Sequence, residues 1–166
     1  MADAPRQIER LPEDATHLVV SAGGNDALGN LAGLDAPVSS IQEALGNLAG
    51  VRDAFQQQYR AMLDEVLGVD LPTAICTIYE ARFPDPDLRR IANTGLAVLN
   101  DVITREAAAR GLPLIDLRVL FDDDADFANP IEPSSQGGEK LAGAIFQLVS
   151  EHDFAEARST VYATAP

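Results

Sequence analysis

The chain has 166 residues, of which 46% are hydrophobic, and this length and composition suit one globular domain. Acidic residues outnumber basic residues by 26 to 12, and the net charge of −14 argues against nucleic acid and anionic membranes as partners. The sequence has neither the apolar segment of a secretory signal nor a stretch of ~18 apolar residues that could span a membrane, so we expect a cytoplasmic protein.

Three short apolar runs predict buried strands, and the segments between them are long enough for helices. The runs cover residues 17–22, 73–79 and 113–117. None of them alternates strictly between apolar and polar residues, which is typical of strands in a sheet that is covered on both faces. The only cysteine, Cys76, lies in the second run, where we expect a buried and inert thiol.

Apolar residues three or four positions apart predict helices over residues 41–67, 88–110 and 135–151. Two glycines, Gly46 and Gly50, could interrupt the first of these helices. Residue types that favour helix ends occur at each boundary. The capping residues that we expect are Ser40 with Glu43, Gly68 in a left-handed conformation, Asp87, Gly111, and Ser134 or Ser135.

The alternation of strands and helices predicts an α/β fold of three layers, α/β/α, with a parallel sheet of flavodoxin-like type. The three strands should be adjacent in chain order. Ligands bind beyond the carboxyl ends of the strands in such sheets, so we expect the site among the loops 23–37, 80–86 and 118–133. One domain should cover residues 1–154, followed by a flexible tail, residues 155–166, in which we see no periodicity.

The segment Ser21–Asp26, which reads SAGGND, follows the first predicted strand. The pair Gly23–Gly24 lets the backbone turn sharply and approach a ligand closely. Asn25 would then present its amide at the carboxyl end of the strand, where the amide can donate a hydrogen bond to a developing oxyanion. A plain tight turn is the alternative interpretation, because glycine, asparagine and aspartate dominate turns.

A second segment, Asn129–Ala142, is a predicted loop that leads into the third helix and reads NPIEPSSQGGEKLA. Pro133 favours an extended Glu132, whose carboxylate would be stabilised by the nearby helix N-terminus. The ordinary chemistry of a helix start is the alternative interpretation. The aspartates within residues 122–126 could attract a hard cation, but they lack an EF-hand pattern and the chain lacks a histidine–cysteine cluster, so we expect no metal.

A strand followed by Gly-Gly-Asn-Asp, with a late Pro-Ser-x-x-Gly-Gly before the last helix, resembles the SGNH hydrolases, the GDSL-like lipases and esterases. The resemblance covers residues 12–149 and implies a serine hydrolase that acts on small-molecule acyl esters without a cofactor or metal. It implies that Asn25 donates to the oxyanion, that Glu132 occupies the position of the catalytic histidine, and that Asn129 occupies that of the aspartate. The residues that it implies as further lining of the substrate site are Gly23, Gly24 and Asp26.

The chain departs from this family at the residues that carry out the chemistry. It contains no Gly-Asp-Ser block with a nucleophilic serine, and neither of its histidines, His17 and His152, lies in the late block. We therefore expect the C-terminal two-thirds of an ester hydrolase domain, incomplete at its N-terminus and inactive by itself. A catalytically dead binding or interaction module on the same fold is the alternative, and an acidic regulatory domain without a glycine-rich phosphate loop is a third interpretation.

The missing block also has a consequence for the sheet. In the family the Gly-Asp-Ser strand lies beside the strand that precedes Gly-Gly-Asn-Asp, so without it residues 18–22 would form an edge. This run is apolar and contains no proline or lysine, which are common protections against edge pairing. We therefore expect either self-association through this edge or marginal stability. Salt should favour the association, because it screens the repulsion between chains of net charge −14.

Overall fold

Four short parallel strands form the central sheet of the structure, a computed structural model that describes residues 1–30, 33 and 36–163. The strands, in their spatial order, are β1 (Leu18–Val20), β2 (Thr73–Cys76), β3 (Leu114–Ile115) and β6 (Val161–Tyr162). Leu18 is in register with Thr73, and Ile75 is in register with Leu114. The predicted parallel order of the first three strands is confirmed, and β1 lies at one edge of the sheet.

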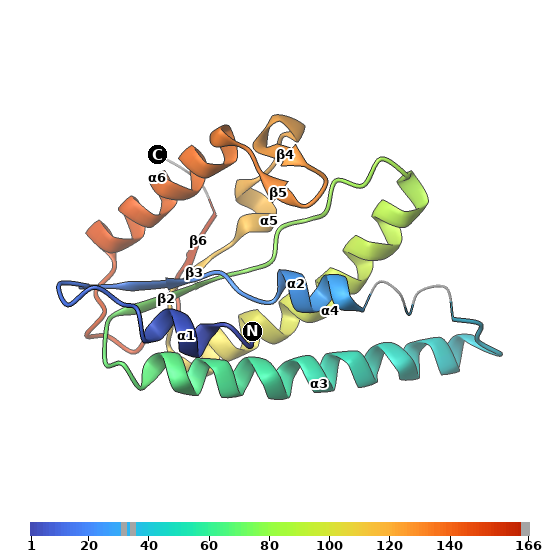
Figure 1. The fold of residues 1–166 in the computed structure, drawn as a ribbon, viewed down its shortest axis with the longest axis horizontal. Coiled ribbons are helices and arrows are strands. Elements are labelled where there is room, and N and C mark those ends of the chain that lie inside the picture. Colours follow the sequence, from blue (N-terminus) through green and yellow to red (C-terminus); the bar gives the residue numbers. More distant parts are fainter. Residues whose placement is uncertain (31–32, 34–35, 164–166) are drawn as a thin grey trace.

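Helices cover both faces of this sheet, as Figure 1 shows. One face packs against α3 (Ile41–Leu67) and α4 (Pro86–Arg110), and the other packs against α5 (Leu117–Leu120) and α6 (Ser135–Glu151). In β2, Ile75 belongs to the first core, whereas Ala74 and Cys76 belong to the second. Burial raises the pKa of the Cys76 thiol to about 12, so the thiol stays protonated. The predicted three-layer α/β/α fold is confirmed.

The helices α3 and α6 have the bounds that the sequence predicts, and the two interior glycines do not interrupt α3. The Ser40 hydroxyl accepts a hydrogen bond from the Glu43 N–H (3.1 Å), but the Glu43 carboxylate accepts from the Ser39 N–H (2.8 Å), so the predicted capping box is only half formed. Ser134 caps α6, and Gly111 ends α4 with a φ of 65° in the left-handed region. These caps explain why the helix ends could be predicted.

Two caps differ from the prediction. Asp85, not Asp87, is the N-cap of α4, and the helix begins at Pro86. Proline suits this first helical position because its backbone nitrogen has no hydrogen to leave unpaired. Gly68 has an ordinary right-handed φ of −65°, and the positive φ of 60° occurs at Asp70 instead.

Several short elements were not predicted. They are α1 (Ala4–Ile8), α2 (Gly24–Gly29), α5, the 3-10 helix η2 (Asp124–Asp126), β4 (Phe127–Asn129) and β5 (Glu132–Pro133), and the last strand, β6, is a further one. The strands β4 and β5 pair in an antiparallel hairpin within the predicted third loop. The helix α2 replaces part of the predicted first loop, so two of the three loops that were expected to carry the site contain regular structure.

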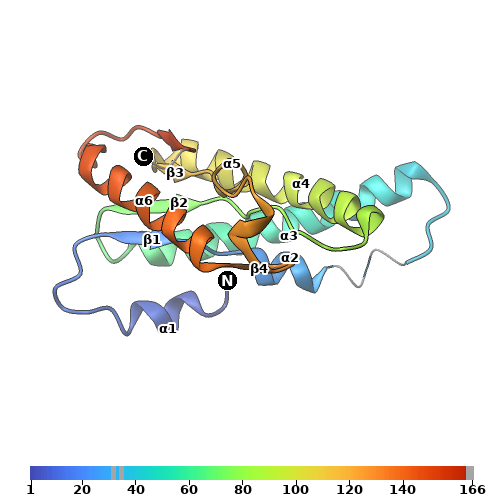
Figure 2. The ribbon, with the colours of Figure 1, turned by 90° about the horizontal axis from the view of Figure 1, so that it is seen from above.

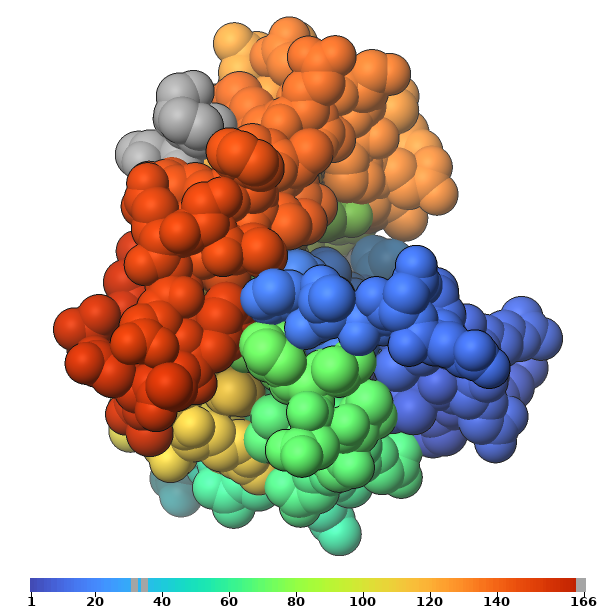
Figure 3. Space-filling model, turned by 90° about the vertical axis from the view of Figure 1, so that its left-hand side faces the viewer, coloured from blue at the N-terminus to red at the C-terminus, as the bar shows by residue number. Residues whose placement is uncertain are grey.

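The last part of the chain, which the sequence analysis expects to be a flexible tail over residues 155–166, contains a short strand. The strand β6 extends the sheet beyond β3: the Leu114 N–H donates to the Thr160 carbonyl and the Asp116 N–H donates to the Tyr162 carbonyl, each at 2.8 Å. These bonds satisfy backbone groups on the second edge of β3. Because β6 has only two residues, its sequence is too short to show the periodicity by which a strand is predicted. Phe154 contacts His17, so the segment after α6 lies against the segment before β1 (Figure 3).

Candidate functional site

A cavity of about 1160 Å³ lies along β1 and reaches the carboxyl ends of β1 and β2. Its walls come from β1, α1, α2, the facing sides of α3 and α4, and the segment that follows β2. Asn25 and Glu132, the two residues that the sequence predicts as catalytic, both line it. Gly23, Gly24 and Asp26 also line it, whereas Asn129 does not belong to its lining. The structure thus brings most of the predicted site residues to one cavity.

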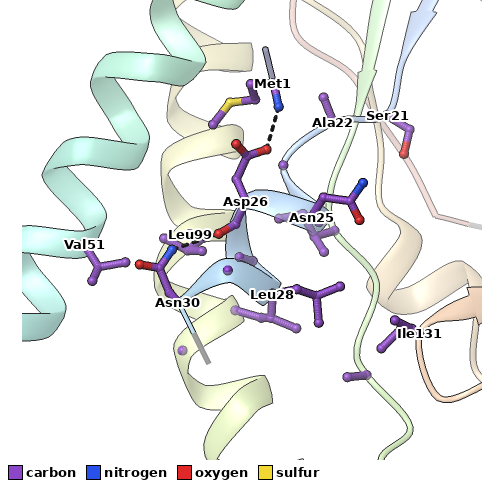
Figure 4. A pocket seen from close by; sticks show the side chains of 18 of the residues that line it. Met1, Ser21, Ala22, Asn25, Asp26, Leu28, Asn30, Val51, Leu99 and Ile131 are labelled. Carbon is purple, nitrogen blue, oxygen red and sulfur yellow. Dashed lines mark hydrogen bonds and ion pairs between the residues drawn. The ribbon is translucent and has the colours of Figure 1, made fainter. Parts of the chain in front are cut away.

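The turn between β1 and α2 requires a glycine. Gly23 has a φ of 107°, and a Cβ at this position would lie only 2.9 Å from the Cζ atom of Phe55. The turn places Asn25 in the first turn of α2 with an exposed side chain. In Figure 4 the amide of Asn25 points away from Asp26, towards the side of the cavity where Ile131 lies. The amide is therefore available to a ligand.

The carboxylate of Asp26 is engaged elsewhere. It accepts a hydrogen bond from the amino group of Met1 at 2.6 Å, which ties α1 to α2 (Figure 4). The side-chain amide of Asn30 donates to the carbonyl oxygen of Asp26 at 2.8 Å and so closes the same helix. Asp26 lines the cavity, but these contacts indicate that its carboxylate holds the N-terminal helix in place.

The hairpin β4–β5 pairs the two predicted positions of the late block. Asn129 is in register with Glu132, and its Nδ2 donates to the Glu132 Oε2 at 2.5 Å. The Asn129 Oδ1 accepts from the Ile131 N–H at 3.0 Å, so the amide closes the hairpin turn with both of its polar atoms. Both side chains are exposed. The hydrogen bond fixes one oxygen of the Glu132 carboxylate at the rim of the cavity.

Two residues that the sequence analysis did not identify hold this hairpin against the segment after β2. The Tyr79 hydroxyl donates to the Ile131 carbonyl at 2.7 Å, and the backbone N–H of Arg82 donates to the Pro130 carbonyl at 2.8 Å. Burial raises the pKa of Tyr79, and the nearby Glu132 carboxylate raises it further, so the hydroxyl remains a donor. The position of Glu132 therefore depends on Tyr79 and Arg82.

Two asparagines of α4 hold the backbone of the segment that follows β2. The Asn100 amide accepts from the Ile78 N–H and donates to the Ile78 carbonyl, both at 2.8 Å. The Asn93 amide makes the same pair of bonds to Ala81, at 2.8 and 3.1 Å. These side chains satisfy backbone groups beyond the end of β2. The only sequence signal for them is their seven-residue spacing on a largely apolar helix face.

The acidic loop before the hairpin is anchored by a lysine. The fully buried Asp126 carboxylate accepts from Lys140 (2.8 Å), from the Gln136 amide (3.0 Å) and from the Asp123 N–H (3.0 Å). Burial alone would raise the pKa of Asp126, but these bonds outweigh it and hold the pKa below its usual range. Lys140 also binds Asp122 at 2.6 Å. Across the described ranges, no three histidine, cysteine, aspartate or glutamate side chains are grouped as a metal site requires.

The comparisons with known proteins give one match. The model of the GDSL-like Lipase/Acylhydrolase family matches residues 1–139, a range that contains both the Gly23–Asp26 turn and the Asn129–Glu132 hairpin. No curated protein and no solved structure matches. No helix within the described part of the chain is long and apolar enough to cross a membrane.

Proposed function

The chain belongs to the GDSL-like Lipase/Acylhydrolase family, and from this membership we propose that the cavity at the carboxyl ends of β1 and β2 binds small-molecule acyl esters. One observation carries the proposal. Asn25 and Glu132 come from segments that are far apart in the chain, yet both line this cavity. An amide donor at an apolar cavity can orient the carbonyl oxygen of an ester, and the Glu132 carboxylate lies at the same rim, where it can accept from polar groups of the rest of the ligand.

In the proposed complex the Asn25 Nδ2 group donates to the carbonyl oxygen of the ester. Donors at ~2.7–3.1 Å from this oxygen also stabilise the charge that develops on it when the carbonyl is attacked. The left-handed Gly23 lets the backbone approach the same oxygen. The apolar part of the ester would then lie against Ile78 and the ring of Tyr79, which line the cavity beside Asn25.

We further propose that the chain binds esters without hydrolysing them. A serine nucleophile needs a base that can accept its proton near neutral pH, and Ser21 at the cavity has no histidine beside it. Both histidines contact Phe154 near the amino end of the sheet, away from Asn25. The Glu132 carboxylate accepts a bond from Asn129 and is exposed to water. This arrangement favours the binding module, the second candidate function.

An esterase assay tests this proposal. With p-nitrophenyl butyrate, we expect the native chain to release p-nitrophenol no faster than the heat-denatured chain, because no activated nucleophile is present. Glu132→Ala and Glu139→Ala, which removes another exposed glutamate, should leave this background unchanged. A clear turnover that Glu132→Ala abolishes and Glu139→Ala preserves would contradict the proposal and make Glu132 a base.

A further inference from the structure

The cavity that holds Asn25 continues over the first half of α4. A Cβ at Gly24, the residue before Asn25, would lie 3.9 Å from the Cγ2 atom of Ile78. The backbone of Ile78 is in turn held by Asn100 of α4. The turn that carries Asn25 therefore lies beside α4, and Figure 4 shows Leu99 of α4 behind α2.

One apolar face of α4 lines the cavity beyond this turn. Its residues recur three or four positions apart and are Ile91, Ala92, Gly95, Leu96 and Leu99. From Leu99 to Ile91 the face is about 12 Å long, given the rise of an α-helix. In Figure 2, α4 begins beyond α2, at the end of the molecule away from β1, β2 and β3, so this face leads away from the sheet. Ile91 is 48% exposed, so the cavity opens to solvent there.

Gly95, in the middle of this face, is not required by the packing of the fold. It lies inside α4, where glycine favours the helix less than alanine does. A Cβ at this position would meet no atom of the described residues within 4 Å. Because no neighbouring group needs a glycine here, its effect is to keep the space over α4 open.

We propose that the cavity selects esters that carry an unbranched alkyl chain, that this chain lies along α4, and that Gly95 determines whether it fits. The inference rests on the proposed function, because Asn25 has to hold the ester carbonyl. A short ester would leave the apolar face of α4 in contact with water, whereas each further methylene group that covers the face strengthens binding. The cavity volume of about 1160 Å³ is at least that of sites for drug-sized ligands, so such a chain has room.

Two isomeric esters test the length of the chain. Ethyl octanoate carries an eight-carbon chain on the acyl side of the ester, and octyl acetate carries one on the alcohol side. Both are titrated into the whole chain beside ethyl butyrate, and NMR shifts of the Asn25 side-chain amide report binding. We expect at least one of the two to bind about 100-fold more tightly than ethyl butyrate, because four more methylene groups are buried. The tighter isomer identifies the side of the carbonyl that faces α4.

Gly95→Leu tests the residue, because its side chain fills the space over α4. We expect this variant to weaken the binding of the tighter isomer about 10-fold relative to that of ethyl butyrate. Gly46→Leu is the matched control. Gly46 also lies inside a helix, and an added Cβ there would meet no described atom within 4 Å, but Gly46 is not among the described lining residues of the cavity. Gly95→Ala carries the test if the leucine variant does not fold, with a loss of about 3-fold.

The outcomes separate this inference from the function on which it rests. If ethyl butyrate binds and neither isomer binds more tightly, the inference is overturned and the proposed function stands. The same holds if the Gly95 variants change the affinity for long and short esters equally, or if Gly46→Leu weakens the binding of the tighter isomer as much as Gly95→Leu does. If no ester binds, ethyl butyrate included, the proposed function is contradicted and the inference is contradicted with it.

Discussion

Replacing Gly137 by alanine is expected to lower the free energy of unfolding by about 3 kcal/mol. An added Cβ would lie 2.3 Å from the carbonyl oxygen of Asp126 and 3.2 Å from its carbonyl carbon, so backbone must move. That carbonyl accepts from the Ser134 N–H at 2.8 Å, and the Asp126 side chain is fixed by Lys140. Because Asp126 directly precedes β4, the movement would also displace the hairpin that carries Glu132.

The neighbouring Gly138 provides the matched control. An added Cβ there would meet no atom within 4 Å, so Gly138→Ala is free of the clash. It should raise the free energy of unfolding by about 0.5–1 kcal/mol, because alanine favours a helix over glycine. Urea unfolding of both variants, followed by circular dichroism, measures the difference. Equal effects of the two substitutions would contradict the close approach of α6 to η2.

A second large effect is expected from Glu106→Ala, at about 2–3 kcal/mol of lost stability. The buried Glu106 carboxylate links α4 to α3 by accepting from Arg60 at 2.7 Å and from Gln56 at 3.2 Å. It also pairs with Arg110, which binds Asp64 of α3. Removing the carboxylate leaves these donors without their shared acceptor. The expected loss of stability is at the lower end for buried ion pairs because the Arg60 side chain is half exposed.

The same carboxylate gives the fold a sensitivity to acid. Burial alone would raise the pKa of Glu106, but the hydrogen bonds from Arg60, Gln56 and Arg110 outweigh burial and hold the pKa below its usual range. A group with a lowered folded pKa contributes stability above its unfolded pKa, about 4.3 for glutamate, and that stability is lost as the pH falls through the folded pKa. Glu106→Gln should therefore weaken the dependence of unfolding on pH in this range.

An exposed ion pair on the same helix is the control for Glu106. Asp101 accepts from Arg105 at 2.7 Å, but both side chains are exposed to solvent. Asp101→Ala should cost less than about 1 kcal/mol at neutral pH. The two alanine variants and the glutamine variant can be compared by urea unfolding at neutral and acidic pH. A loss for Asp101→Ala as large as that for Glu106→Ala would show that burial of the carboxylate is not the decisive factor.

Much of the fold could be predicted because its long helices carry local signals. Ser40 and Ser134 each accept a hydrogen bond from an N–H in the first turn of the helix that follows. Serine is a preferred N-cap residue, so the sequence itself marks where α3 and α6 begin. The start of α4 was misplaced because Asp87 and Asp85 are equally good caps. The proline after Asp85 is the signal that distinguishes them.

The candidate site was only partly predictable because its support is tertiary. Asn25 and Glu132 follow from motifs, but the contacts of Tyr79 and Asn100 join segments that no local pattern relates. The strand β6 could not be predicted either, because its two residues form a strand only by pairing with β3. Side-chain bonds to backbone groups and short strands depend on the folded arrangement, and a single sequence gives them no periodicity.

Asn25 is expected to present its amide to an ester in the cavity beside β1. The direct measurement is an NMR titration of the chain with ethyl butyrate, comparing Asn25→Ala with Asn30→Ala, whose amide already donates to the Asp26 carbonyl. We expect saturable shifts of the Asn25 side-chain amide, binding about 5-fold weaker in Asn25→Ala, as one neutral hydrogen bond provides, and unchanged affinity in Asn30→Ala. An Asn25→Ala variant that binds the ester as tightly as the unaltered chain would contradict this role of the Asn25 amide.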